Sequence, residues 1–153
     1  MNPVRHGPDD AQLADIFALV HRCFAYMDGR IDPPSSLHRM TVADIARQCR
    51  EGEVWSLGAP LVACVLLTPR PDCLYLGKLA VDPGWRGRGL ARQLVSLATD
   101  RARALGLPRL ELETRIELVE NHAAFRRLGF VKTATSTHPG FDRPTSVIMQ
   151  KPL

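Results

Sequence analysis

The sequence has no long apolar run. Its longest uninterrupted apolar stretch, residues 61–67, is far shorter than the roughly 20 residues that a helix needs to span a bilayer. Residues 1–6 have no apolar stretch behind their charges, so we expect no signal peptide. The expected protein is therefore cytoplasmic and has no membrane partner.

The cysteines form no metal or disulfide pattern. Cys23, Cys49, Cys64 and Cys73 lie 26, 15 and 9 residues apart, so there is neither a Cys-x-x-Cys pair nor a zinc spacing. Cys64 and Cys73 fall in strand-like segments, where a buried, reduced thiol is the ordinary state. We expect free thiols, which fit the reducing cytoplasm, and no metal.

Aromatic residues are few and dispersed, with five Phe, two Trp and two Tyr. A nucleic-acid binder would more often show an extended basic stripe interleaved with aromatics. The net charge of +4 is a modest excess and the aromatic residues are dispersed, so we expect no nucleic-acid partner. Most arginines are expected on the solvated surface. Arg86, Arg88 and Arg92 differ because they crowd one turn, where an anionic ligand would explain them. A small RNA-binding protein stays as a third hypothesis, and it would bind in a steeply salt-dependent way.

The chain has the length of one ordinary domain and no repeat or long linker, so we expect a single domain over residues 1–153. Apolar residues three and four apart predict helices, and short apolar runs between Gly and Pro breaks predict strands. Paired prolines exclude regular structure from residues 28–36. The predicted elements are helices 9–27 and 42–50, strands 54–57, 61–67 and 74–81, helix 88–105, strand 110–114, helix 120–128, and strands 130–135 and 145–150. This order indicates a mixed sheet with helices on its faces.

A glycine-rich turn joins the strand at 74–81 to the helix at 88–105. It reads Arg86-Gly87-Arg88-Gly89-Leu90-Ala91. Glycines let a ligand approach the main chain closely, and the first turn of a helix leaves its N–H groups unpaired at the positive end of the helix dipole. Such a turn binds a pyrophosphate through its backbone, and the neighbouring arginines add long-range attraction for an anion.

Two common phosphate-binding motifs do not fit this turn. A P-loop needs Gly-Lys-Ser/Thr, whereas Gly89 is followed by Leu90 and Ala91. The dinucleotide fingerprint G-x-G-x-x-G/A needs a small residue where Arg92 stands, and it opens the first strand–helix unit rather than a late one. Taken alone, Gly-x-Gly before a helix is a weak signal, and ordinary loop geometry is the alternative.

The wider context resembles motif A of the GNAT superfamily of acyl-CoA-dependent N-acyltransferases, Gln/Arg-x-x-Gly-x-Gly/Ala, which Arg86, Gly89 and Ala91 fill. Residues 121–130 resemble motif B of that family, and the resemblance covers about residues 53–150. It implies the α/β (α+β) GNAT fold, a mixed central sheet of about seven strands with about four helices on its faces. In this fold the sheet is splayed between its fourth and fifth strands, where pantetheine lies.

The resemblance implies an N-acetyltransferase that takes acetyl-CoA as cosubstrate and acetylates the amine of a small molecule or peptide. A homodimer is left open. Backbone groups of Leu79 and Val81 would pair with the pantetheine arm like an added strand, and Phe125 would lie near the thioester. Asn121 would hydrogen-bond the cofactor, with a simple helix N-cap as the alternative. The implied cofactor-binding residues are Leu79, Ala80, Val81, Arg86, Gly87, Arg88, Gly89, Leu90, Ala91, Asn121 and Phe125.

The sequence departs from the family at its catalytic positions. Many members carry a tyrosine near the leaving thiolate, where this chain has Phe125, and a glutamate base on the fourth strand, where it has Tyr75. A phenol is a poor base near neutral pH. We therefore take Glu113 and His138 as substitute catalytic candidates. The alternatives are a surface carboxylate or a partner of Arg115 for the first, and an ordinary loop histidine for the second.

These departures motivate a second hypothesis, a catalytically silent module that binds acyl-CoA and regulates. Acetyl transfer to a cognate amine separates the two hypotheses, whereas coenzyme A binding alone does not. A site without a strong base also favours weakly basic acceptors. Deprotonating a lysine-type amine at pH 7 costs about 4.6 kcal/mol, against about 1 kcal/mol for an α-amino group.

Overall fold

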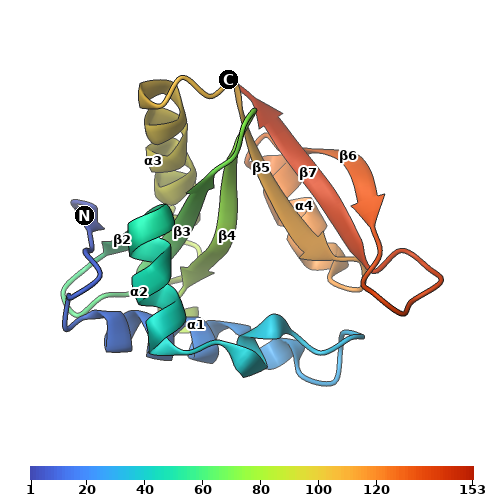
Figure 1. The fold of residues 1–153 in the computed structure, drawn as a ribbon, viewed down its shortest axis with the longest axis horizontal. Coiled ribbons are helices and arrows are strands. Elements are labelled where there is room, and N and C mark those ends of the chain that lie inside the picture. The colour runs from blue at the N-terminus through green and yellow to red at the C-terminus, as the bar shows by residue number, and fades with distance from the viewer.

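The computed structural model describes residues 1–153 as a seven-stranded mixed sheet with four α-helices (Figure 1). The strand order is β1-β2-β3-β4-β5-β7-β6, and every neighbouring pair is antiparallel except β4–β5. The helices are α1 (Leu13–Phe24), α2 (Val42–Glu51), α3 (Leu90–Ala104) and α4 (Val119–Arg127). The strands are β1 (Val4–Arg5), β2 (Glu53–Leu57), β3 (Ala63–Pro69), β4 (Leu74–Val81), β5 (Arg109–Arg115), β6 (Val131–Ser136) and β7 (Ser146–Pro152).

The predicted fold class and all predicted elements are confirmed, with shifts at their ends. The first helix begins at Leu13 rather than residue 9, because the Asp10 side chain accepts a hydrogen bond from the Gln12 N–H and forms a turn there. It continues as a short 3₁₀ helix, η1 (Ala25–Met27). The segment expected to be irregular ends in a second 3₁₀ helix, η2 (Ser36–Arg39). Strand β1 was not predicted, because two residues are too few to show a hydrophobic period.

The helices form two layers on the sheet. The apolar faces of α1 and α2 pack on one face, and α3 packs on the other, where Phe125 and Leu128 of the α4 region also join the core. The cysteines are free as expected, and three of them are buried. None of the helices is both long and apolar enough to cross a membrane. Strand β4 lies between the two layers, so its side chains alternate between two buried surfaces.

The sheet is open in its middle. Strands β4 and β5 pair only at Leu74–Leu110 and Tyr75–Glu111, and from Leu76 onward β4 has no strand neighbour on that side. Figure 1 shows the two strands meeting near the C terminus and diverging from there. The predicted splay between the fourth and fifth strands is thus confirmed. The open edge leaves backbone groups of β4 free to pair with a ligand.

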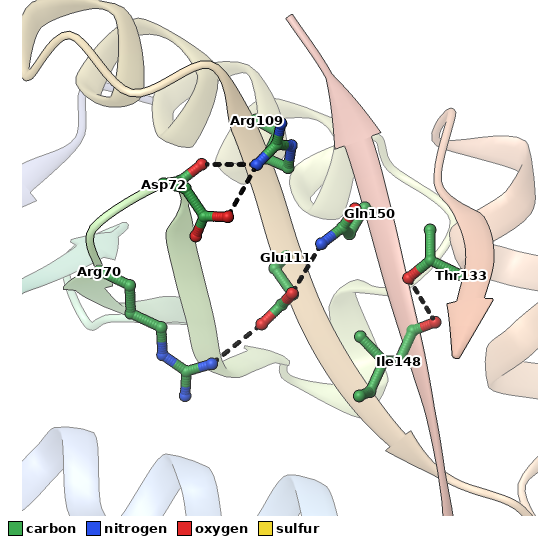
Figure 2. Close-up of polar contacts among 7 residues, drawn as sticks. All are labelled: Arg70, Asp72, Arg109, Glu111, Thr133, Ile148 and Gln150. Carbon is green, nitrogen blue, oxygen red and sulfur yellow. Dashed lines mark hydrogen bonds and ion pairs between the residues drawn. The ribbon is translucent and has the colours of Figure 1, made fainter. Parts of the chain in front are cut away.

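Polar side chains hold the closed end of the splay together. The Arg70 guanidinium donates to Glu111 Oε2 at 2.9 Å, and Gln150 donates to the other Glu111 oxygen at 2.8 Å, so one carboxylate of β5 links the β3–β4 turn to β7 (Figure 2). Arg109 reaches across to Asp72 in the same view. The Arg70 guanidinium also lies 3.8 Å from the centre of the Tyr75 ring, which it holds in place.

A buried ion pair attaches α3, the helix that follows the glycine turn, to the sheet. Glu53 accepts from Arg101 Nε at 2.8 Å and from its Nη2 at 2.9 Å, and from the Trp55 indole at 2.8 Å. Burial raises the pKa of Glu53, but the hydrogen bonds from Arg101 and Trp55 outweigh it and hold that pKa below its ordinary value. The stabilisation is therefore present at neutral pH and is lost as the pH falls from about 4.3 through the lowered value.

We expect Glu53→Gln to lower the free energy of unfolding by about 2 kcal/mol, because Arg101 stays partly buried without its carboxylate partner. Urea unfolding at pH 7 measures this loss. Arg47→Gln is the control, because its ion pair with Asp44 is exposed and should contribute less than about 0.5 kcal/mol. If Glu53→Gln lowers the free energy of unfolding no more than Arg47→Gln does, the Glu53–Arg101 ion pair does not stabilise the attachment of α3.

Candidate active site

The glycine turn has the geometry that an anion requires. Gly87 and Gly89 have φ values of +77° and +80°, a region that L side chains rarely adopt, so the turn needs glycine at both positions. Gly89 is the N-cap of α3 and provides no capping side chain. The backbone N–H groups of residues 86–92 donate to no other group of the protein. These unpaired donors indicate a binding site for a ligand that has several acceptor oxygens.

A cavity of about 720 Å³ extends from this turn along β4 to α4. Every predicted cofactor-binding residue lines it except Arg88, whose guanidinium lies 4.7 Å from the centre of the Trp85 ring. Arg92 and Arg127 also line it, so the predicted excess of positive charge at the turn extends to α4. The Arg127 contribution was not predicted, because it depends on how α4 packs and not on the motif.

The open edge of β4 forms one wall of this cavity through Leu79, Ala80 and Val81. The Cys23 thiol donates to the Val81 carbonyl at 3.2 Å, so α1 is attached to the same edge. Burial raises the pKa of Cys23 and keeps it a neutral thiol near pH 7. A neutral thiol in this position supports the wall and offers no nucleophile.

Asn121 is not the N-cap that was one of its two interpretations. Helix α4 begins at Val119 after Leu118, and no side chain caps it. The Asn121 amide instead donates to the Tyr26 hydroxyl at 3.0 Å and joins α4 to η1 beside the cavity. The pairing with Tyr26 could not be read from the sequence, because the two residues are 95 positions apart.

A second cavity of about 330 Å³ lies at the other end of the splay. Four residues line both cavities, namely Phe24, Leu79, Asn121 and Phe125. The candidates Tyr75, Glu113 and His138 all line the second one, so three positions from β4, β5 and the β6–β7 loop come together there. Figure 1 shows β4 and β5 on the two sides of the gap and the β6–β7 loop beyond them, at the lower right of the view.

Tyr75 cannot act as the missing base. Burial, together with the negative charge of Glu113, raises the pKa of Tyr75 to about 12, so the phenol stays protonated at any physiological pH. We expect Tyr75→Phe to change kcat less than threefold, as measured by initial rates of thiol release. A loss of kcat of about a hundredfold in this variant would show that the Tyr75 phenol takes part in the reaction.

Glu113 projects from β5 into the second cavity and is exposed to solvent. The predicted alternative, a pair with Arg115, does not form. Arg115 donates instead to the carbonyl oxygens of Pro33 and Pro34, at 2.7 and 3.2 Å. Glu113 is therefore a carboxylate without an ion-pair partner, facing the cavity.

Thr145 holds both the backbone and the imidazole ring of His138. Its backbone N–H donates to Thr145 Oγ1 at 2.9 Å, and its Nδ1 lies 2.5 Å from the same oxygen. The Thr145 hydroxyl donates its own proton to Ser136 O at 3.4 Å, so its oxygen can accept a hydrogen bond from the Nδ1–H of His138. Burial and the charge of Arg115 lower the pKa of His138, so the ring is neutral near pH 7. Its Nε2 makes no hydrogen bond within the protein.

The chain belongs to the acetyltransferase (GNAT) family, whose model matches residues 13–130. It is 35% identical to the mycothiol acetyltransferase of Beutenbergia cavernae, over 66% of this chain and 37% of that protein. It is 29% identical to the IAA acetyltransferase of Azospirillum brasilense, over 82% of each. The chain thus spans little more than a third of the first relative and most of the second.

The fold is shared with solved structures of the same family. The PaiA N-acetyltransferase from Thermoplasma acidophilum, in complex with coenzyme A, superposes with a TM-score of 0.80 over 100% of both chains at 11% identity. A second structure, an acetyltransferase of the GNAT family from Listeria monocytogenes, has a TM-score of 0.76 at 18% identity over 99% of this chain and 94% of that one. At these identities the likeness shows the fold alone.

Proposed function

We propose that this chain, as a single domain, transfers the acetyl group of acetyl-CoA to the amine of a small molecule or peptide. The observation that supports this most is the meeting of the two cavities at Phe24, Leu79, Asn121 and Phe125. A thioester that enters from the glycine turn and an amine that enters from the other cavity would meet at these residues, which is what direct transfer requires.

The protein would hold the cosubstrate mainly through its backbone. The free N–H groups of residues 86–92 would bind the pyrophosphate, with Arg86, Arg92 and Arg127 adding positive charge around it. The unpaired edge of β4 would bind the pantetheine amides as an added strand. Phe125 would pack beside the thioester, where it excludes water without donating a proton.

The acceptor amine would lose its proton to His138. In the neutral ring Nδ1 donates to Thr145, so the lone pair on Nε2 is the free one and can take the proton from the ammonium ion. The neutral amine then attacks the thioester carbon, the C–S bond breaks as the C–N bond forms, and the second nitrogen proton passes to the departing thiolate or to solvent. Coenzyme A leaves as a thiolate, which needs no acid because thiol pKa values lie near 8.5. Glu113 would attract the ammonium ion to this place.

The experiment is a panel of α-amino, aliphatic and peptide amines incubated with acetyl-CoA and the protein, with free thiol and N-acetylated product both measured. The proposal expects at least one amine for which the two rise together. Tight binding of acetyl-CoA with no product from any amine would favour the catalytically silent regulatory module instead.

A further inference from the structure

The second cavity has an excess of unpaired positive charge. Lys78 in β4, Arg115 at the end of β5 and Arg39 at the end of η2 all line it, and none of them forms an ion pair with a carboxylate. Glu113 is the one carboxylate in the lining. Arginines nearby on the surface are paired, as Arg30 is with Glu120 and Arg143 with Asp32.

Lys78 faces this cavity because of a bulge in β4. Lys78 stands opposite Leu66 and Leu76 stands opposite Leu67, so Gly77 is an extra residue in the strand. The extra residue shifts the alternation of side chains, which places Lys78 on the same face as Tyr75 although the two are three positions apart. The bulge thus turns an ammonium group into the cavity.

The ammonium of Lys78 has little around it that compensates its charge. It is half-buried, it lies 6.0 Å from the centre of the Phe24 ring, and it makes no hydrogen bond within the protein. Burial lowers the pKa of Lys78, and the charge of Arg115 lowers it further. A buried cation without a partner is costly, and an anion brought by a ligand would remove that cost.

Arg115 is already held in place. Its contacts with the Pro33 and Pro34 carbonyls use part of the fork of five donors, and the remaining N–H groups are free. The acids on the loops behind it form no ion pair with it, since one Glu117 oxygen accepts from the Asp32 backbone N–H and Asp32 pairs with Arg143. A guanidinium fixed in this way binds a carboxylate or phosphate with little loss of conformational freedom.

We propose that the acceptor is an amine that also carries an anionic group, a carboxylate or a phosphate, which Lys78 and Arg115 bind while Arg39 attracts it at the rim. This inference rests on the proposed acetyl transfer to an amine. It divides the cavity by charge, with Glu113 for the ammonium end and the two cations for the anionic end. A diamine of the same length would place its second ammonium against Lys78 and should be a poor acceptor.

The test uses primary amines of equal chain length that end in a carboxylate, a phosphate, a hydroxyl or a second ammonium group. With acetyl-CoA saturating, kcat/KM for the carboxylate or the phosphate member should exceed that of the hydroxyl member at least about tenfold. The higher of those two values identifies which anion the cavity accepts. The diamine should be the slowest of the four.

Lys78→Met keeps the length of the side chain and removes its charge, so it should reduce the preference for the anionic member over the hydroxyl member about tenfold. Lys132→Met, on the exposed strand β6, is the matched control and should leave that preference unchanged. Calorimetric binding of the four amines to the protein with coenzyme A bound gives a readout that needs no turnover.

The two proposals can fail separately. If the anionic amine binds at least tenfold more tightly than the hydroxyl amine but none of the four is acetylated, recognition of the anion holds and the proposed acetyl transfer fails. If the hydroxyl amine or the diamine binds and reacts as well as the anionic members, or if Lys78→Met leaves the preference intact, the inference of an anionic acceptor is overturned while acetyl transfer stands.

Discussion

Replacing Gly89 with aspartate is expected to weaken coenzyme A binding by at least about a hundredfold, equivalent to about 2.7 kcal/mol. The new carboxylate would stand at the N-cap of α3, beside the free N–H groups that the pyrophosphate needs. It would both repel the phosphates and accept from those groups itself, because aspartate is a preferred N-cap. Isothermal titration with coenzyme A measures the change.

The control for this variant is Gly106→Asp at the other end of α3. Gly106 also has a positive φ, +72°, and open space where a Cβ would stand, so the backbone strain is matched. This variant should lose at least about 1 kcal/mol of stability, because its carboxylate also stands at the negative end of the helix dipole, and it should keep its coenzyme A affinity. If Gly89→Asp folds and binds coenzyme A as tightly as the wild type does, the pyrophosphate binds elsewhere.

Removing the imidazole of His138 is expected to lower kcat about a hundredfold or more, because general base catalysis typically contributes that much. His138→Gln should leave coenzyme A affinity unchanged, since the residue lines only the second cavity. Because burial and Arg115 lower the pKa of His138, the neutral, active form predominates at pH 7. In the wild type, kcat should therefore stay level near neutral pH and fall only below pH 6.5, through the lowered pKa. In His138→Gln this fall should vanish.

Two further variants decide between the candidates for the base. His38→Gln changes an exposed histidine that pairs with Asp28, and it should have no effect on kcat. Glu113→Gln should raise KM for the amine more than it lowers kcat, because we assign the carboxylate to attraction of the ammonium ion. A hundredfold loss of kcat in Glu113→Gln together with a loss below threefold in His138→Gln would make Glu113 the base.

The elements that the sequence predicted well are those with a local cause. Strand β4 was placed with its observed ends, Leu74 and Val81, because proline and glycine chemistry bounds the apolar run on both sides. The start of the predicted second helix has a local cause as well, the capping box that Thr41 and Asp44 form at the start of α2. The glycine turn also has a local cause, since positive φ at Gly87 and Gly89 and a helix start without a capping side chain are properties of a few adjacent residues.

The parts that were not predicted depend on long-range packing. The hydrogen bond from Asn121 to Tyr26 forms because α4 and η1 meet beside the cavity, and the alternative interpretation of Asn121 as an N-cap is wrong because α4 begins two residues before it. The sequence could not predict that the Lys78 side chain faces the second cavity, because a bulge in the pairing of β3 with β4 sets the direction of this side chain. Glu113 and His138 were chosen singly from the sequence, and only the splay of the sheet shows that they share one cavity.

The most direct test of the account is a single-turnover reaction. Protein loaded with one equivalent of acetyl-CoA is mixed with an amine selected from the panel, and CoA thiol, N-acetyl product and free acetate are quantified together. The account predicts thiol and N-acetyl product in equal amounts, with little acetate, and a loss of both products in Gly89→Asp. Thiol released with acetate and without N-acetyl product, or acetyl-CoA that stays intact on the protein against every amine, would contradict it.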